Sequence, residues 1–320
     1  MRVFYYCFDH NRPTGGIKQI YRHVDILRRH GCEAFVLHDT PGARATWFEN
    51  QTPVIDRATF AGRHDPAADF VVLPEDLGAR ILDFPGRKVV FNQNVWYGFA
   101  AFGWSLPPRY PYLDPEVVAA LAVSDHNREY LRFAYPRLEV LRVWYGVDAA
   151  RFTPRPLASK DRAIACAPKA LPEVYALLHL LQSRARQGLN RLGGYDWVLL
   201  QGKSEAEVAA LLNRCRLLLF LSTAEGLGLL PLEAMLSGCL VAAYAVGPPR
   251  EYLPPQFQHE PHDLLGLARW VEALAEPPPS EVAAWQAVAD AGRATALRYG
   301  LEREEESVLA AWARIRELGR

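Results

Sequence analysis

Short apolar runs alternate along the chain with stretches in which apolar residues recur every three or four positions. The runs are bounded by polar or turn residues and predict buried parallel strands at 2–8, 33–38, 70–73, 89–91, 121–124, 138–143, 163–166, 197–200, 217–221 and 239–243. The helical spacing predicts helices at 17–30, 114–120, 125–133, 172–186, 261–275, 280–298 and 302–318. Strands that alternate with helices in this way predict an α/β fold with doubly wound, Rossmann-like parallel sheets.

The length of the chain predicts two such domains. Its 320 residues exceed what one ordinary hydrophobic core contains. The segment Thr153-Pro154-Arg155-Pro156 has the composition of a linker. We therefore expect an N-terminal domain over 1–152 and a C-terminal domain over 153–300, followed by a terminal helix at 301–320.

The strongest local signal is the run from Ser222 to Gly238, which predicts a strand end, a glycine-containing turn and a helix. Ligands of open α/β sheets bind at the carboxyl ends of the strands, and free N–H groups at a helix start favour a phosphate there. Glu225 lies in the turn and Glu233 in the first turns of the helix. Two carboxylates that flank an anion site suit a ligand with phosphates in the middle and hydroxyls on both sides, such as a nucleotide sugar.

A second signal is the polar and aromatic stretch that follows the strand at 89–91. Gln93 and Asn94 have amide groups that can pair with sugar hydroxyls, and Trp96 has an aromatic face that can pack on a sugar ring. A hydrophobic flap over the core is an equally good interpretation of the aromatic residues. Gly15 and Gly16 stand between the first strand and the first helix, where turn geometry alone or a close ligand approach would explain them.

Composition limits the classes of protein that need to be considered. Lys plus Arg and Asp plus Glu number 36 each, so the overall charge gives no pull toward nucleic acid or an anionic membrane. No apolar run approaches the ~20 residues of a membrane-spanning helix, and no signal peptide is apparent, so we expect a cytoplasmic protein. Arg22, Arg28 and Arg29 leave a peripheral membrane contact open. The five cysteines lie in or beside predicted strands without a CxxC motif, which favours buried free thiols.

The run Glu225-Gly226-Leu227-Gly228-Leu229, with Glu233 eight positions after Glu225, resembles the signature of retaining GT-B glycosyltransferases of the bacterial family-4 type (glycosyl transferases group 1). Leu227 stands where that family usually has Phe. The segment Gly146-Val147-Asp148 also resembles one near the family's domain junction, with Tyr145 in place of Asn. The resemblance implies a GT-B fold, in which two Rossmann-like domains face a cleft and the C-terminal helix returns to the N-terminal domain.

The resemblance also implies roles for individual residues. Glu225 would contact the donor sugar, Glu233 the ribose, and Lys169 the diphosphate, with Glu225 and Lys169 as the catalytic pair. Donor binding would further involve Gly226, Leu227, Gly228, Leu229, Lys203 and Arg250. The acceptor would meet His10, Gly15, Gly16, Gln93, Asn94 and Trp96. Only five of the 36 basic residues are lysines, which favours a functional role for Lys169 and Lys203. The neighbour of Lys169 is Ala170, where the family commonly has a second basic residue.

The expected activity is transfer of a sugar from a UDP- or GDP-sugar, with retention of configuration and without a metal ion or cofactor. The acceptor would be a sugar, a glycolipid or a polysaccharide, as in polysaccharide biosynthesis. Two alternatives stay open: a non-catalytic nucleotide- or sugar-binding protein, and a GT-B-fold epimerase or phosphorylase. Pro248 and Pro249 remove amide donors from a turn that binds phosphate in the family, which keeps the non-catalytic alternative open.

Overall fold

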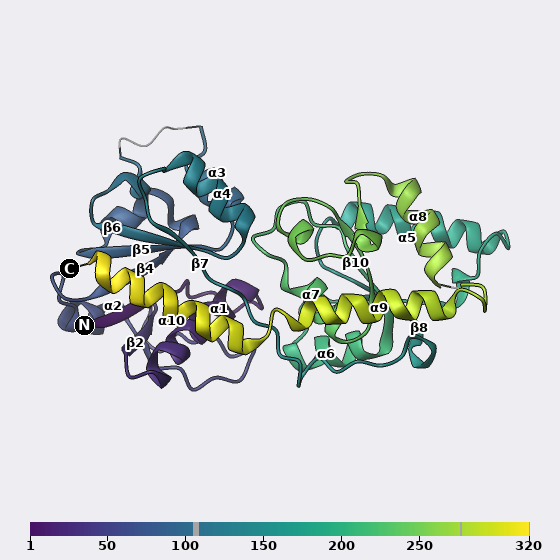
Figure 1. Ribbon diagram of the computed structural model, residues 1–320, viewed down its shortest axis with the longest axis horizontal. Coiled ribbons are helices and arrows are strands. Elements are labelled where there is room, and N and C mark those ends of the chain that lie inside the picture. The colour runs from purple at the N-terminus through teal and green to yellow at the C-terminus, as the bar shows by residue number, and fades with distance from the viewer. Residues whose placement is uncertain (105–108, 276, 320) are drawn as a thin grey trace. The chain divides into compact units, whose positions relative to one another are not determined.

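The computed structural model describes residues 1–104, 109–275 and 277–319. The chain divides into two compact units, Met1–Tyr145 with Leu301–Arg320, and Gly146–Gly300 (Figure 1). Each unit contains one sheet, and every strand pair in both sheets is parallel. The expected architecture of two doubly wound α/β domains is therefore confirmed.

The sheet of the first unit has the order β3-β2-β1-β4-β5-β6-β7. Its strands are β1 (Arg2–Tyr6), β2 (Glu33–Leu37), β3 (Val54–Ile55), β4 (Phe70–Pro74), β5 (Arg87–Asn92), β6 (Val117–Ala122) and β7 (Val140–Arg142). From β1, strands β2 and β3 are added on one side of the sheet, and strands β4 to β7 are then added on the other side. The topological switch point, where ligands of such sheets bind, therefore lies between the carboxyl ends of β1 and β4.

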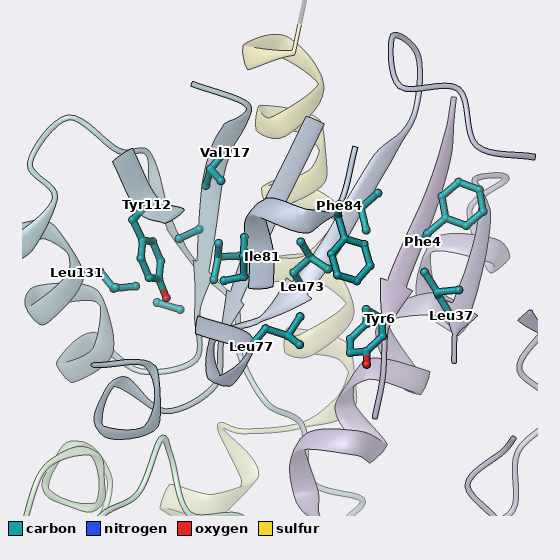
Figure 2. Packing of buried hydrophobic residues seen from close by; sticks show 14 of the residues in the cluster. Phe4, Tyr6, Leu37, Leu73, Leu77, Ile81, Phe84, Tyr112, Val117 and Leu131 are labelled. Carbon is teal, nitrogen blue, oxygen red and sulfur yellow. The ribbon is translucent and has the colours of Figure 1, made fainter. Parts of the chain in front are cut away.

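One face of this sheet carries the hydrophobic core shown in Figure 2. Alternate strand residues such as Phe4, Tyr6 and Leu73 point to this face because side chains alternate along a strand. The covering elements are α2 (Arg57–Arg63), the 3₁₀ segment η1 (Glu75–Asp83), α3 (Val95–Ala100), the 3₁₀ segment η2 (Pro111–Leu113) and α4 (Asp125–Ala134). The core thus fixes the loops that leave β4 and β5.

The other face packs against α1 (Gly15–Arg29) and the C-terminal helix α10 (Leu301–Leu318). Trp312 of α10 is fully buried and donates a hydrogen bond of 2.9 Å from its indole N–H to the Tyr5 hydroxyl. Arg22 of α1 pairs with the buried carboxylate of Glu304. These contacts make the last helix part of the first unit.

The sheet of the second unit has the order β12-β11-β10-β8-β9. Its strands are β8 (Asp161–Cys166), β9 (Asp196–Leu199), β10 (Cys215–Phe220), β11 (Leu240–Tyr244) and β12 (Gln258–His259). The chain starts at β8, places β9 on one side and β10 on the other. The switch point of this sheet therefore lies between the carboxyl ends of β8 and β10.

Helices connect these strands and cover the sheet. They are α5 (Leu171–Arg186), α6 (Glu205–Arg214), α7 (Leu229–Leu236), α8 (Leu264–Ala275) and α9 (Val282–Leu297). Helix α5 packs with α8, while α7 packs with α6 and α9. Ser204 and Glu207 form a capping box at the start of α6. The cysteines are buried and free, and burial raises the pKa of the Cys7, Cys166 and Cys215 thiols to about 12.

Two details of the fold differ from the sequence expectations. Residues 117–120 belong to strand β6 and not to a helix, because Val117 and Ala119 pair with β5 inside the sheet. The expected domain boundary at 152/153 lies inside the second unit, because Val147 already forms a bridge with Gly300. Among the described residues, no helix has both the length and the apolar composition needed to cross a membrane.

Candidate functional site

The switch point of the second sheet brings together two of the expected site residues. Lys169 follows β8 and Glu225 follows β10, and their side chains form an ion pair between Lys169 Nζ and Glu225 Oε1. The Glu225 side chain is 9% exposed and that of Lys169 is 43% exposed. The Lys169 cation also lies 5.8 Å from the centre of the Phe220 ring. The site thus presents a cation, from the end of β8, that could bind an anion. It also presents a buried carboxylate, from the end of β10, that could accept hydrogen bonds from hydroxyl groups.

The glycine turn after Glu225 is held by an aromatic residue that sequence analysis did not single out. Gly228 has a φ of 84° and precedes the first residue of α7, Leu229. The Tyr252 hydroxyl donates to the Gly228 carbonyl at 2.7 Å and also lies 3.2 Å from the Leu227 carbonyl oxygen. Leu227 is buried beneath the turn. The turn therefore keeps a fixed shape with its carbonyls turned to Tyr252.

The other expected donor-side residues lie along the same edge of the sheet. Glu233 lies on α7 and is half-buried. Lys203 follows β9 and is also half-buried. Arg250 is exposed beyond β11, and its guanidinium donates to the carbonyl of Ala245 within its own turn. Pro248 and Pro249 begin a 3₁₀ turn there, and this turn lacks the two amide donors, as expected.

The carboxyl edge of the first sheet, at and beside its switch point, also brings expected residues together. Gln93 follows β5, and Gly16 lies in the first turn of α1. A carbon atom added at Gly16 would lie 2.5 Å from Gln93 Oε1, so only glycine lets the Gln93 side chain approach this closely. The Tyr145 hydroxyl donates to Gln93 Oε1 at 2.7 Å. Gly16, Gln93 and Tyr145 therefore form one cluster.

Glu75 is a further member of this cluster that sequence analysis missed. It follows β4 and is 4% exposed. Its carboxylate accepts hydrogen bonds from the backbone N–H groups of Gln93 and Asn94 at 2.9 and 2.7 Å. Burial raises the pKa of Glu75 to about 8, against the effect of the Gln93 and Asn94 amides. Two carboxylates, Glu75 and Asp76, directly after an apolar strand were the available sequence signal.

The remaining expected acceptor-side residues follow the carboxyl ends of β1 and β5. Asn94 caps α3 by accepting from the Trp96 N–H at 3.0 Å. Trp96 is 40% exposed and packs beside His126 and Tyr130. His10 is exposed, and its ring stacks on that of Phe8 with 6.4 Å between the ring centres. Burial raises the pKa of Asp76, and the charge of His10 opposes that rise. Gly15 is exposed at the first position of α1.

Comparisons with known proteins agree with this architecture. Residues 189–262, which include the Glu225–Glu233 run, match the family described as Glycosyl transferases group 1. An alpha-1,6-glucosyltransferase of Actinobacillus pleuropneumoniae serotype 7 (strain AP76) is 23% identical over 263 residues, covering 75% of this chain and 72% of that protein.

Solved structures share the fold over nearly the whole chain. Sucrose-phosphate synthase from Thermosynechococcus elongatus superposes with a TM-score of 0.71 at 13% identity, covering 98% of each chain. Anabaena Alr3699/HepE in complex with UDP-glucose gives a TM-score of 0.70 at 15% identity, covering 98% of this chain and 100% of that chain.

The fold and the two strand-edge sites therefore define a GT-B protein. More particularly, residues 189–262 of its second unit match the glycosyl transferases group 1 family. The family match and the 23%-identical relative support a glycosyltransferase activity, whereas the solved neighbours support the fold.

Proposed function

We propose that the protein transfers a sugar from a nucleotide-diphosphate sugar to a hydroxyl group of an acceptor, with retention of configuration. The observation that carries this proposal is the Lys169–Glu225 pair at the switch point between β8 and β10. A diphosphate sugar presents a negative group to the lysine and hydroxyls to the carboxylate. The neighbour solved with UDP-glucose supports UDP-glucose as the first donor to test.

In the proposed reaction the bond between the sugar C1 and the diphosphate oxygen breaks, and C1 forms a new bond to the acceptor oxygen. The acceptor's proton goes to the departing diphosphate. The nucleoside diphosphate then leaves the site. Retention follows when the acceptor approaches from the face that the leaving group vacates. The developing charge on the diphosphate is stabilised by Lys169, and such stabilisation is the largest catalytic contribution in many enzymes.

The neighbouring residues would fix the rest of the donor. Glu233 on α7 accepts hydrogen bonds from ribose hydroxyls, and the amides of the turn from Gly226 to Leu229 face the diphosphate. Lys203 adds positive charge from the end of β9. Arg250 has a smaller part, because its guanidinium already binds the Ala245 carbonyl. We assign neutralisation of the diphosphate to Lys169 and propose that the reaction needs neither a metal ion nor a cofactor.

The polar cluster of the first unit is proposed to bind the acceptor. Gln93 and Asn94 offer amide groups at the end of β5, and Trp96 offers an exposed ring directly after them. His10, Gly15 and Gly16 line the neighbouring loop. A sugar, a glycolipid or a polysaccharide end would present hydroxyls to these groups. A cytoplasmic location stays a prediction.

The test combines binding and turnover. Isothermal titration with UDP, GDP and ADP identifies the base, and release of UDP from UDP-glucose is then followed with and without EDTA. The proposal predicts micromolar binding of one nucleotide and sugar release that EDTA does not abolish. No binding of any of the three nucleotides would sink the proposal.

A non-catalytic nucleotide-binding role is the second candidate. It is favoured by Ala170, which replaces a basic neighbour of Lys169, and by the engagement of Arg250 with its own turn. Nucleotide binding without sugar release or transfer to any acceptor would support this alternative.

A further inference from the structure

The Gln93 backbone is fixed by the carboxylate of Glu75, which directly follows strand β4. Both oxygens of Glu75 accept amide N–H groups of the turn after β5, one from Gln93 and one from Asn94. These bonds are shorter and stronger when Glu75 is ionised, that is, above its raised pKa of about 8. The buried Glu75 therefore ties the end of β4 to the turn and restricts the directions in which the Gln93 side chain can point.

The Gln93 side chain is fixed as well. Its Oε1 accepts from the buried Tyr145 hydroxyl at 2.7 Å and lies directly against Gly16. A carboxamide has one oxygen acceptor and two N–H donors on its nitrogen. With Oε1 engaged by Tyr145, the polar group that the side chain still offers is Nε2.

Nε2 of Gln93 has no hydrogen-bond partner within the part of the chain that the structure describes, although the residue is half-buried. A rigidly held donor beside a cluster at the switch point is suited to a ligand oxygen. We infer that Gln93 donates a hydrogen bond from Nε2 to a hydroxyl oxygen of the acceptor sugar, and that Glu75 and Tyr145 are positioning residues for it. The inference rests on the proposed function and names the group that selects the acceptor.

The positioning role of Glu75 has a pH signature. Burial raises the pKa of this carboxyl to about 8. When Glu75 is protonated, one oxygen carries a hydrogen and accepts the facing amide less well. The titratable groups around it are Asp76, Tyr112 and Tyr145; the pKa of each is raised, chiefly by burial. The tyrosines stay neutral near pH 8, so the acceptor KM is expected to fall as pH rises through about 8.

The kinetic test uses UDP-glucose as donor and D-glucose, N-acetyl-D-glucosamine and maltotriose as probe acceptors. Gln93→Glu keeps the shape of the side chain and the bond from Tyr145, but replaces the Nε2 donor by an oxygen. We expect its acceptor KM to rise about tenfold or more, as for a lost hydrogen bond that leaves two acceptors facing each other. Gln51→Glu, an exposed Gln in the same unit, is the matched control and should change the KM less than twofold.

Tyr145→Phe and Glu75→Gln test positioning. Each should raise the acceptor KM several-fold with a smaller change in kcat, and Glu75→Gln should remove the dependence of KM on pH near 8. A Gln93→Glu variant with unchanged KM overturns the donor role. A pH dependence that survives in Glu75→Gln overturns the positioning role of that residue.

Nuclear magnetic resonance of the ¹⁵N-labelled full chain separates the two hypotheses. The side-chain NH₂ signal of Gln93 is identified by its loss in Gln93→Glu, and it should shift when a probe acceptor is added with UDP. The backbone signals of Gln93 and Asn94 should titrate with pH in the wild type and not in Glu75→Gln. Failure to bind any nucleotide refutes the proposed function alone, whereas UDP binding with no Gln93 NH₂ shift for any probe refutes this inference.

Discussion

Replacing Glu225 by Gln separates the two halves of the proposed donor. Glu225 pairs with Lys169, so a diphosphate must compete with this carboxylate for the lysine. Glutamine keeps the size of the side chain and removes its charge. The variant therefore frees Lys169 for the diphosphate, while it weakens the hydrogen bonds that we propose Glu225 makes to the donor sugar.

The magnitude follows from the exposure of the pair. The Lys169 side chain is 43% exposed, so solvent screens the interaction, and pairs of this kind contribute about 1 kcal/mol or less. Release of Lys169 should then strengthen UDP binding by up to about fivefold. A hydrogen bond to a charged group contributes about 1.5–3 kcal/mol, so losing that of Glu225 outweighs this gain and weakens UDP-glucose binding by about two- to thirtyfold.

Isothermal titration of UDP and UDP-glucose at moderate salt measures both changes. The affinities should move in opposite directions, and the gain for UDP should vanish in the Lys169→Met background, as a double-mutant cycle requires for interacting residues. Glu281→Gln, at an exposed carboxylate of the same unit, is the control and should alter neither affinity. If UDP and UDP-glucose weaken together, the reasoning from the ion pair is refuted.

Three other predictions test separate parts of the structure. Glu233→Gln should weaken the binding free energy of UDP, measured by isothermal titration, by about 1.5–3 kcal/mol if Glu233 binds the ribose. An unchanged UDP affinity would be evidence against that contact. Gly228→Ala forces a side chain into a φ of 84° with Tyr252 Oη only 3.1 Å away, so thermal unfolding should show a loss of about 1–2 kcal/mol that Gly194→Ala, in open space, does not show. The pKa of Glu75 rises on folding from the ordinary 4.5 to about 8, so its contribution to stability is full below pH 4.5 and lost as pH rises through 8. Urea unfolding between pH 5 and 9 should show a decline in stability that is smaller in Glu75→Gln; equal slopes would contradict the assignment.

Most of the secondary structure could be predicted because it depends on local spacing. Strands β10 and β11 of the second sheet are short apolar runs, and the helices beside them carry regular apolar faces, whereas the two-residue strand β12 (Gln258–His259) has no apolar run and was not predicted. The capping box at Ser204 was readable because its partners lie three positions apart. The helix expected at 114–120 was wrong because the Asp-Pro-Glu start favours a helix locally, whereas pairing of Val117 and Ala119 with β5 decides for a strand.

The candidate site was only partly predictable. Its polar residues could be placed at strand ends from the sequence, because parallel strands put all their carboxyl ends at one edge. Residue spacing alone could not show which of them meet, because β8 and β10 are neighbours only through the sheet order; the family resemblance grouped Lys169 with Glu225 but did not give their ion pair. Glu75 was missed since its partners, the amides of Gln93 and Asn94, lie in the turn after the next strand, and the position of Glu75 after an apolar strand does not reveal them.

The sequence by itself determined the alternation of strands and helices, the two-domain α/β class and the run from Glu225 to Glu233, because these depend on the spacing of neighbouring residues. The tertiary structure decided which side chains contact one another. It paired Lys169 with Glu225, placed Tyr252 on the glycine turn, and joined Glu75 and Tyr145 to Gln93. The physical reason is that burial and hydrogen bonding are satisfied between segments distant in sequence, so chain order alone leaves those contacts undetermined.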